Sequence, residues 1–450
     1  MRANALLDLR QLLEHLRSRQ LLVEVDEVEA EYEAAWYLKL YDSRRAVLFR
    51  RVRGYEMGAV GNVFTNREIL YAVLNARSDK EAFTKLLYAV DNPQKPREVV
   101  NINGYKSIGD DVYKLPIFTF YEGDGGPYLT SSIVIAKDPD LVDFQNASFH
   151  RMMVIGERKL AVRIVPRHLH KILSKAKARG WDLEVLVAIG APPHFCIAAA
   201  TSPPYGVSEL NVAVTLAEGR LRAVDVGYSG LLAPEGCEVL ILGRILKDET
   251  AREGPFVDIT GTHDIVRDQP VLEVEDILVR PGAVLYEILP AGEEHRLLMG
   301  FPREALIWRS VSAVVPSVKA VRLTRGGCGW LSAVVSIEKR TEGDGKLAIL
   351  AAFAAHPSLK LVTVVDEDID VDDPYQVEWA LATRMQPDED VIIVRGVRGS
   401  SLDPSADQRR LITSKMGIDA TRPLDRPKEH FMRAWIPSKE SQRPEQAPPS

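Results

Sequence analysis

The middle of the chain constrains the fold most, because it is a succession of short aliphatic segments separated by glycine and proline. Only two helical patterns interrupt it, His168–Ala178 and Ser208–Leu216, and Ser208 suits the N-cap of the second. Many strands with few helices predict a barrel or a sandwich here rather than a doubly wound sheet. The predicted strands are Ser131–Ala136, Leu160–Val165, Leu183–Ile189, Arg220–Val226, Cys237–Ile245 and Val271–Val279.

The two flanking regions alternate between helix and strand, which is typical of α/β domains. The N-terminal predictions are a helix carrying Leu6, Leu9, Leu13 and Leu16, strands Leu21–Val25 and Ala46–Arg50, and helices Glu31–Tyr41 and Arg67–Leu74. The C-terminal predictions are strands Val318–Leu323, Leu331–Ile337, Leu361–Val365 and Val391–Val394, with helices Lys346–Ala355 and Tyr375–Arg384.

The fold class is therefore α/β, with α+β character in the middle. We expect domains at 1–110, 111–302 and 303–422, followed by a C-terminal segment at 423–450. The first boundary lies at or just after residues 91–97, which contain two prolines and no apolar anchor.

Composition narrows the class of protein. The 450 residues are 46% hydrophobic and 27% charged with a net charge of −6, which is unlike a disordered chain or a basic nucleic-acid binder. Three distant cysteines match no disulfide framework or zinc finger. The first 20 residues lack a signal-peptide pattern, and the apolar run Leu347–Ala355 is too short to span a bilayer. We expect a cytoplasmic protein without a membrane span or a nucleic-acid partner.

Two carboxylates five residues apart, Glu253 and Asp258, flank the chain-breaking Gly254 and Pro255. One interpretation is a solvated turn. The other is a paired acid site, in which a cation keeps one carboxylate ionised while its desolvated partner keeps a proton. The second interpretation needs an arginine and an apolar cavity.

A second set of polar residues lies in Asn146–Arg151, Arg167–His168 and Ser208–Glu209. Taken singly, Asn146 suits a turn, His168 suits a surface, and Glu209 suits a helix N-terminus. Together, an amide oxygen, an imidazole and a carboxylate suit Mg²⁺ or Mn²⁺ better than zinc, particularly beside a phosphate. The residues alone leave both interpretations open.

Two further segments contain charged residues at turns. Lys415, amid small and hydroxyl residues in Ile412–Thr421, suits either a phosphate contact or a surface turn. The acidic run Asp366–Asp370 lacks the glycine and terminal glutamate of an EF-hand loop. We favour a structural role for it, as an acidic strand end that caps a helix, with His356 ordering the preceding turn.

These blocks, in this order, resemble the UbiD-type decarboxylases, which use prenylated FMN. The resemblance covers residues from about 5 to about 425. It implies an N-terminal α/β domain, a central prenyl-FMN-binding domain like a split flavin-reductase barrel, and a C-terminal α/β domain. It also implies a C-terminal helix followed by a tail in 423–450, and a homodimer or higher homo-oligomer. The motifs that carry the resemblance are Asn146–Arg151, Arg167–His168, Ser208–Glu209, Glu253–Gly261, Ala355–Lys360, Asp366–Asp370, Ala382–Met385 and Ser414–Thr421.

The resemblance also implies a cofactor site. Asn146, His168 and Glu209 match the ligands of a divalent metal, Mn²⁺ or Mg²⁺, which bridges to the flavin phosphate; His170 is the alternative to His168, and a K⁺ ion beside the metal is left open. Lys415 matches the lysine that holds the phosphate. The full cofactor set is Asn146, Ser148, Arg151, Arg167, His168, Pro204, Glu209 and Lys415.

The catalytic residues that the resemblance implies are Arg151, Glu253 and Asp258. Loss of CO₂ from an sp² carbon needs an electron sink that no side chain supplies, so a cofactor must supply it. We assign Asp258 as proton donor and Glu253 as its partner, and Arg151 orients both and polarises the substrate carboxylate. The two acid roles can be exchanged, because coupled carboxylates need not keep separate identities.

The chain is most similar to the short archaeal members, which convert trans-anhydromevalonate 5-phosphate to isopentenyl phosphate in a modified mevalonate pathway. The alternative substrate is an aromatic or polyprenyl-hydroxybenzoate acid. Cations for a substrate phosphate could come from Arg163, Arg167, Arg309 or Arg325. A flavin prenyltransferase is the expected cofactor supplier. Two other classes of function are a flavin-binding oxidoreductase and a non-catalytic flavin-binding paralogue, but every acid, arginine and metal position of the motifs is filled.

Overall fold

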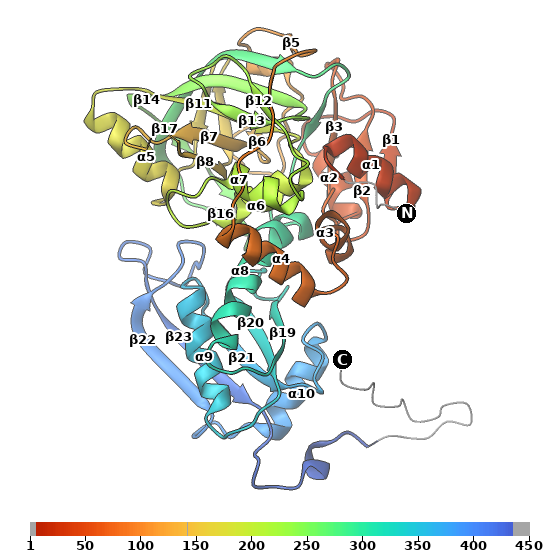
Figure 1. The fold of residues 1–450 in the computed structure, drawn as a ribbon, viewed down its shortest axis with the longest axis vertical. Coiled ribbons are helices and arrows are strands. Elements are labelled where there is room, and N and C mark those ends of the chain that lie inside the picture. Colours follow the sequence, from red (N-terminus) through yellow and green to blue (C-terminus); the bar gives the residue numbers. More distant parts are fainter. Residues whose placement is uncertain (1–5, 142, 435–450) are drawn as a thin grey trace.

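The computed structural model describes residues 6–141 and 143–434. Figure 1 shows the N-terminal and middle regions together at one end of the molecule and the C-terminal domain at the other. The helix α8 (Glu293–Ser312) joins the two ends. It packs against α4 (Asp79–Asp91) and α6 (Pro193–Thr201) on the first side, and against α9 (Asp344–Ala355) and β19 (Val318–Leu323) on the second.

A four-stranded sheet of order β1-β2-β3-β18 forms the N-terminal region. The predicted helices and strands of this region are all present, whereas β3 and α4 were not predicted. The last strand, β18 (Val284–Tyr286), comes from the end of the middle region and pairs in parallel with β3. A Cβ on Gly61 would lie 2.7 Å from the Glu287 carbonyl oxygen, so glycine permits this close approach. The other elements are α1 (Leu9–Ser18), β1 (Leu22–Val25), α2 (Glu33–Leu40), β2 (Ala46–Phe49), β3 (Gly58–Gly61) and α3 (Arg67–Leu74).

The middle region is a nine-stranded sheet of order β6-β9-β10-β17-β14-β11-β7-β8, with β5 added to β17, and its pairings are all antiparallel. Among the described residues the strand path stays open between β6 and β8. The strands are β5 (Lys106–Ser107), β6 (Tyr128–Leu129), β7 (Ile133–Lys137), β8 (Gln145–Phe149), β9 (Met152–Gly156), β10 (Lys159–Val162), β11 (Leu183–Ile189), β14 (Val239–Glu253) and β17 (Arg267–Val279). Short β4 (Val99–Asn101), β12 (Ala223–Asp225) and β13 (Leu232–Pro234) make a separate sheet.

Three helices accompany this sheet: α5 (His168–Ala178), α6 and α7 (Glu209–Leu216). The first and third were predicted, although the side chain of Ser208 makes no capping bond to α7. Helix α6 was missed because nearly all its residues are buried, so it has no polar face to create a helical period. Its Pro193 occupies the first turn, where the missing N–H costs nothing.

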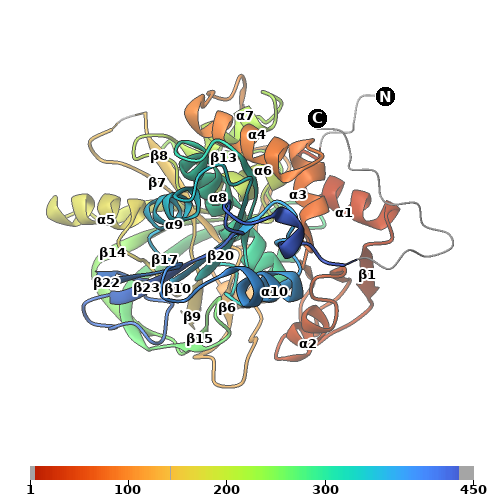
Figure 2. The same ribbon diagram turned by 90° about the horizontal axis from the view of Figure 1, so that it is seen from below.

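The C-terminal domain is a five-stranded sheet of order β19-β20-β21-β23-β22 with a parallel centre. Figure 2 shows α9 and α10 on opposite sides of it. Strand β23 was not predicted, because three polar residues, Thr413–Lys415, follow its first residue Ile412. The predicted C-terminal helix and tail span 423–450, of which 435–450 lie outside the described residues; within 423–434 the structure has no α-helix but one short 3-10 helix, Lys428–Phe431. The remaining elements are β20 (Ser332–Ile337), β21 (Leu361–Asp366), α10 (Pro374–Arg384), β22 (Val391–Arg398) and β23 (Ile412–Ala420).

The acidic run at the end of β21 holds a buried arginine. Arg384 of α10 lies 2.5 Å from Asp366 and 2.7 Å from Asp368, and its side chain is fully buried. His356 ends α9, and its Nε2 lies 3.1 Å from the Trp330 carbonyl oxygen. Both contacts agree with a structural role, but the predicted capping is wrong, because the N-cap of α10 is Asp373, outside the acidic run.

No helix among the described residues is long and apolar enough to cross a membrane.

The Arg384 cluster gives a stability prediction. Replacing Arg384 with alanine leaves Asp366 buried without its cation, so the free energy of unfolding should fall by about 3–5 kcal/mol. The exposed Asp370→Ala in the same run is the control and should change it by less than about 0.5 kcal/mol. Urea unfolding curves measure both, and equal midpoints for the two variants would contradict the structural role.

Candidate active site

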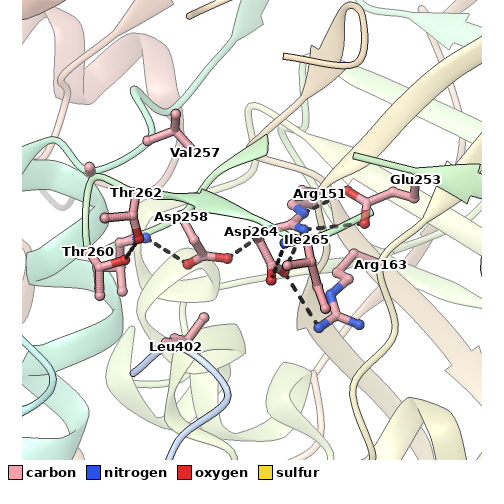
Figure 3. Close-up of polar contacts among 12 residues, drawn as sticks. Arg151, Arg163, Glu253, Val257, Asp258, Thr260, Thr262, Asp264, Ile265 and Leu402 are labelled. Atoms are coloured by element: carbon pink, nitrogen blue, oxygen red, sulfur yellow. Dashed lines mark hydrogen bonds and ion pairs between the residues drawn. The ribbon is translucent and has the colours of Figure 1, made fainter. Parts of the chain in front are cut away.

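Arg151 lies between strands β8 and β9, and three carboxylates surround its guanidinium (Figure 3). Its Nε and Nη2 donate to Glu253 at 2.8 and 3.2 Å. Its Nη1 donates to Asp258 at 2.6 Å, and its Nη2 also donates to Asp264 at 3.0 Å. The structure therefore brings the predicted Arg151, Glu253 and Asp258 into contact.

The local chain path explains why these acids meet. Strand β14 ends at Glu253, and a cis peptide bond between Gly254 and Pro255 leads into the small hairpin of β15 (Phe256–Val257) and β16 (His263–Asp264). Gly254 has a φ of +101°, a backbone conformation that residues with a side chain rarely adopt, so glycine suits this position. The segment predicted as a loop or turn is thus a hairpin that returns a further acid to the arginine.

Asp264 is the carboxylate that sequence reasoning missed. It lies opposite Phe256 in the hairpin, and the Phe256 ring centre is 4.6 Å from the Arg151 guanidinium carbon. Tyr128 donates to Glu253 at 3.3 Å on the other side. The sequence did contain a signal for this hairpin. Thr260–Thr262, with glycine at its centre, suits a turn, and the pairs Phe256–Val257 and Ile265–Val266 on either side of it are aromatic or β-branched.

The charges at this site balance. Burial lowers the pKa of Arg151, but the facing Glu253 and Asp258 outweigh it and raise that pKa above its usual value. Burial likewise opposes ionisation of Asp264, yet its ion pairs with Arg267 and Arg151 lower its pKa below the usual range. Arg163, 3.7 Å from Asp264, completes a group of three arginines and three carboxylates.

Asp258 is the carboxylate of this group that a ligand can reach most easily. Its side chain is 18% exposed, whereas that of Glu253 is fully buried. Cys328 of the C-terminal domain has its Sγ 3.9 Å from the carbonyl oxygen of Thr260, which follows Asp258 in the same hairpin. His295, in the first turn of α8, accepts from the Ala291 N–H through Nδ1 at 3.2 Å; burial lowers its pKa, and the nearby charge of Asp258 acts in the opposite direction. The site therefore lies where the middle and C-terminal domains meet.

The predicted metal ligands are only partly brought together. Glu209 is buried at the start of α7 and accepts from the Asn146 side chain and the Ala147 N–H, each at 2.8 Å. Burial raises the pKa of Glu209 to about 8, and no basic side chain pairs with it in the described part of the chain. A buried carboxylate beside an amide, without a cation, is an environment that fits a divalent metal ion.

His168 begins α5, and its ring packs edge-on against Tyr205 with the centres 5.2 Å apart. It lines a cavity of about 360 Å³ together with Pro204 and with Pro302 of α8. His170 is exposed. Within residues 6–141 and 143–434, the structure has no group of three His, Cys, Asp or Glu side chains that could hold a metal ion. The predicted metal site therefore needs the Asn146 amide as one of its ligands.

Lys415 and Ser148 also lie in polar surroundings. Lys415 on β23 is buried; its Nζ donates to the Pro357 carbonyl at 2.5 Å, and burial lowers its pKa to about 8. Ser148 on β8 contacts Asn146 at 3.3 Å and His150 at 2.9 Å. A buried lysine without a carboxylate partner in the described chain fits a bound anion such as a phosphate.

Of the four arginines predicted as sources of positive charge, three are paired. Arg163 lies near Asp264, Arg309 is 3.1 Å from Asp91 at the surface, and Arg325 is 3.1 Å from Glu293. Arg167 has no carboxylate partner among the described residues and is exposed.

Comparison with known proteins gives matches along nearly the whole chain. Models of the 3-octaprenyl-4-hydroxybenzoate carboxy-lyase (UbiD) N-terminal, Rift-related and C-terminal domains match residues 13–90, 93–293 and 296–420. A protein described as anhydromevalonate phosphate decarboxylase from Methanothermobacter thermautotrophicus is 47% identical over 92% of this chain and 97% of its own. A phenolic acid decarboxylase from Bacillus subtilis is 31% identical over 93% of each chain.

Two solved structures are also similar. The UbiD-class enzyme HmfF from Pelotomaculum thermopropionicum in complex with FMN has a TM-score of 0.92 and 39% identity, covering 96% of this chain and 97% of its own. An evolved dimeric form of the same enzyme, in complex with prFMN, has a TM-score of 0.88 and 37% identity with the same coverage. The overall architecture described above is therefore that of a UbiD-class enzyme.

The ion pairs of Asp264 give a pH prediction. Because its pKa is lower in the folded than in the unfolded chain, its ion pairs stabilise the fold fully above the unfolded value of about 3.9 and are lost as the pH falls through the lower folded value. The melting temperature of Asp264→Asn should thus lie below that of the parent protein at neutral pH, and the gap should close below about pH 4. Melting curves across pH measure this, and a gap that persists in acid would contradict it.

Proposed function

The chain belongs to the UbiD family of carboxy-lyases, and we propose that it is a prenylated-FMN-dependent decarboxylase that converts trans-anhydromevalonate 5-phosphate to isopentenyl phosphate. The reaction releases CO₂ and places a proton on the carbon that carried the carboxylate. The observation that carries the proposal is the Arg151 guanidinium held by Glu253 and Asp258 where two domains meet. The archaeal relative's description supports the choice of substrate.

The residues present fit the cofactor. Glu209 and Asn146 supply oxygen ligands for Mn²⁺ or Mg²⁺, with His168 as the third ligand, and Lys415 supplies a positive charge for the flavin phosphate. Arg151, Ser148, Arg167 and Pro204 complete the proposed set; a K⁺ ion beside the divalent metal is a further part of this proposal. When bound, prenylated FMN supplies the electron sink that loss of CO₂ from an sp² carbon requires.

The chain's own residues bind and orient the substrate and move the proton. Arg151 faces the substrate carboxylate with a guanidinium that three carboxylates hold in place, so its position is fixed before the substrate arrives. Asp258, the most exposed carboxylate of the group, takes up a proton from solvent and passes it to the carbon that carried the carboxylate. Glu253 is buried and bound to Arg151 and Tyr128, which suits a partner that keeps the arginine oriented.

Assembly and supply of the cofactor follow from the same proposal. We infer a homodimer or higher homo-oligomer in the cytoplasm, loaded by a flavin prenyltransferase. The dimeric relative solved with prFMN supports this inference.

Two alternative functions make different demands on the same residues. Decarboxylation of an aromatic or polyprenyl-hydroxybenzoate acid would use the same acids and arginine. The similarity to a phenolic acid decarboxylase supports this alternative. A flavoprotein that does not decarboxylate would need neither Glu253 nor Asp258.

Activity of the reconstituted enzyme tests the substrate. Protein co-expressed with a flavin prenyltransferase should convert trans-anhydromevalonate 5-phosphate to isopentenyl phosphate and leave hydroxybenzoates and cinnamic acids unchanged. Product analysis by mass spectrometry distinguishes these acids, whereas CO₂ release alone does not. Turnover of the aromatic acids only would replace the proposed substrate with the alternative one.

Arg151→Ala tests the acid network. It should reduce turnover at least about 10²-fold, because both substrate orientation and the alignment of Asp258 are lost. The fold should persist, as measured by circular dichroism, and the surface variant Arg410→Ala is the control. Unchanged turnover in Arg151→Ala would end the proposal for this network.

Glu209→Ala tests the metal and cofactor site. The variant should purify with less flavin and less manganese per chain than the parent protein, because the proposed bridge to the flavin phosphate loses a ligand. Flavin absorbance and metal analysis of the purified protein measure this, and exposed Glu218→Ala is the control. A fully loaded Glu209→Ala variant would contradict the metal assignment.

A further inference from the structure

A second group of positive charges lies between the middle and C-terminal domains, apart from the balanced group at Arg151. Arg303 of α8 donates to the Ser202 hydroxyl at 3.1 Å, and its guanidinium carbon is 5.8 Å from the centre of the Trp330 ring. The Trp330 ring in turn packs on His356, with the centres 4.4 Å apart. Lys415 binds the carbonyl of the next residue, Pro357. We call Arg167, Arg303 and Lys415 the cation cluster, and all three charges act on the buried, uncharged ring of His356.

The cation cluster lacks negative partners. Within residues 6–141 and 143–434, none of Arg167, Arg303 and Lys415 forms an ion pair with a carboxylate. Burial, followed by the charge of Arg167, lowers the pKa of Arg303 to about 10. The buried indole N–H of Trp330 also has no acceptor in the described chain. Unpaired cations and an unpaired donor in one place indicate that an anion binds there.

The cofactor phosphate does not account for the whole cluster. A phosphate monoester carries a charge of about −1.5 to −2 near neutral pH. A divalent metal at Glu209 together with Lys415 already offsets that phosphate and the Glu209 carboxylate. Arg303, which is outside the proposed cofactor set, remains without a counter-charge, and with Arg167 near it suits a second phosphate monoester.

We propose that Arg303, assisted by Arg167, binds the phosphate group of the substrate, and so selects phosphorylated unsaturated acids over aromatic ones. This inference rests on the proposed function. Ser202 and the Trp330 face fix the plane of the Arg303 guanidinium, which presents two parallel N–H groups to phosphate oxygens. The Trp330 N–H supplies a further donor.

The cluster is connected to the acid site through one turn of the C-terminal domain. Cys328, in the glycine-rich turn before Trp330, has its Sγ 3.9 Å from the Thr260 carbonyl oxygen of the acid hairpin. The same turn thus contacts the hairpin that carries Asp258 and ends at the tryptophan beside Arg303. A short substrate with a carboxylate at one end and a phosphate at the other suits two such adjacent sites, Arg151 for the first and Arg303 for the second.

Steady-state kinetics of the prenylated-FMN-loaded enzyme tests the proposal. Arg303→Met should raise KM for trans-anhydromevalonate 5-phosphate about 10- to 100-fold, the effect of losing charge-assisted hydrogen bonds to one anion, and should change kcat much less. Arg303→Lys, which keeps the charge without the fork, should give an intermediate KM. The non-phosphorylated acid should bind parent and variant equally weakly. Arg410→Met, whose arginine pairs with Asp407 at the surface, is the control and should leave KM unchanged.

A second measurement separates the substrate phosphate from the flavin phosphate. The ratio of flavin to protein in purified Arg303→Met should equal that of the parent, whereas Lys415→Met should lower it. A lower ratio in Arg303→Met with unchanged KM would overturn the proposal and assign Arg303 to the cofactor. Unchanged KM and unchanged loading in both Arg303 variants would overturn it as well.

Calorimetry with isopentenyl phosphate and inorganic phosphate keeps this inference separate from the proposed function. If the parent holoenzyme does not turn over the phosphorylated acid, the proposed function fails, but these titrations still measure the phosphate site. Binding at least about 10-fold weaker in Arg303→Met than in the parent would support the site. Equal binding, or no binding by the parent, would overturn it.

Discussion

The ion pairs between Arg151 and the carboxylates of one long hairpin are the constraint on which the rest of the site depends. A guanidinium as buried as this one is costly unless anions surround it, so the hairpin must deliver them in the right place. The β14–β17 ladder runs from Val239 opposite Val279 to Glu253 opposite Arg267, and its register sets where the small β15–β16 hairpin begins. A shift of one residue would turn Glu253 away from the arginine.

The two polar groups at the meeting of the domains differ in their charge balance. Around Arg151, three arginines and three carboxylates offset one another, so the group carries no net charge before a substrate binds. Around Arg303 and Lys415, the contacts that the described residues supply are a carbonyl, a hydroxyl and aromatic faces, and none is a carboxylate. The first environment suits proton transfer and orientation, and the second suits phosphate groups, which carry their own negative charge.

Sequence reasoning predicted the elements whose residues follow a clear period, such as the α1 leucines and the strand Leu183–Ile189, and it predicted the contact of Arg151 with Glu253 and Asp258. It missed Asp264, because its approach to Arg151 depends on a hairpin that reverses the chain within a few residues. It missed α6, which has no polar face. It also missed Arg303, because a single arginine in a helical segment is not unusual in a sequence, and only the structure shows that it forms no ion pair with a described carboxylate. The position of His168 relative to Asn146 and Glu209 stays a prediction.

The strand β18 shows that the N-terminal sheet is assembled from two distant parts of the chain. Its residues, Val284–Tyr286, follow the whole middle region, yet they form the fourth strand beside β3. A fragment cut at residue 90, where the N-terminal family model ends, would expose the unpaired backbone of β3 and be prone to aggregation. The N-terminal sheet is therefore complete only when the chain has been made through residue 286, so the N-terminal and middle regions are expected to fold together.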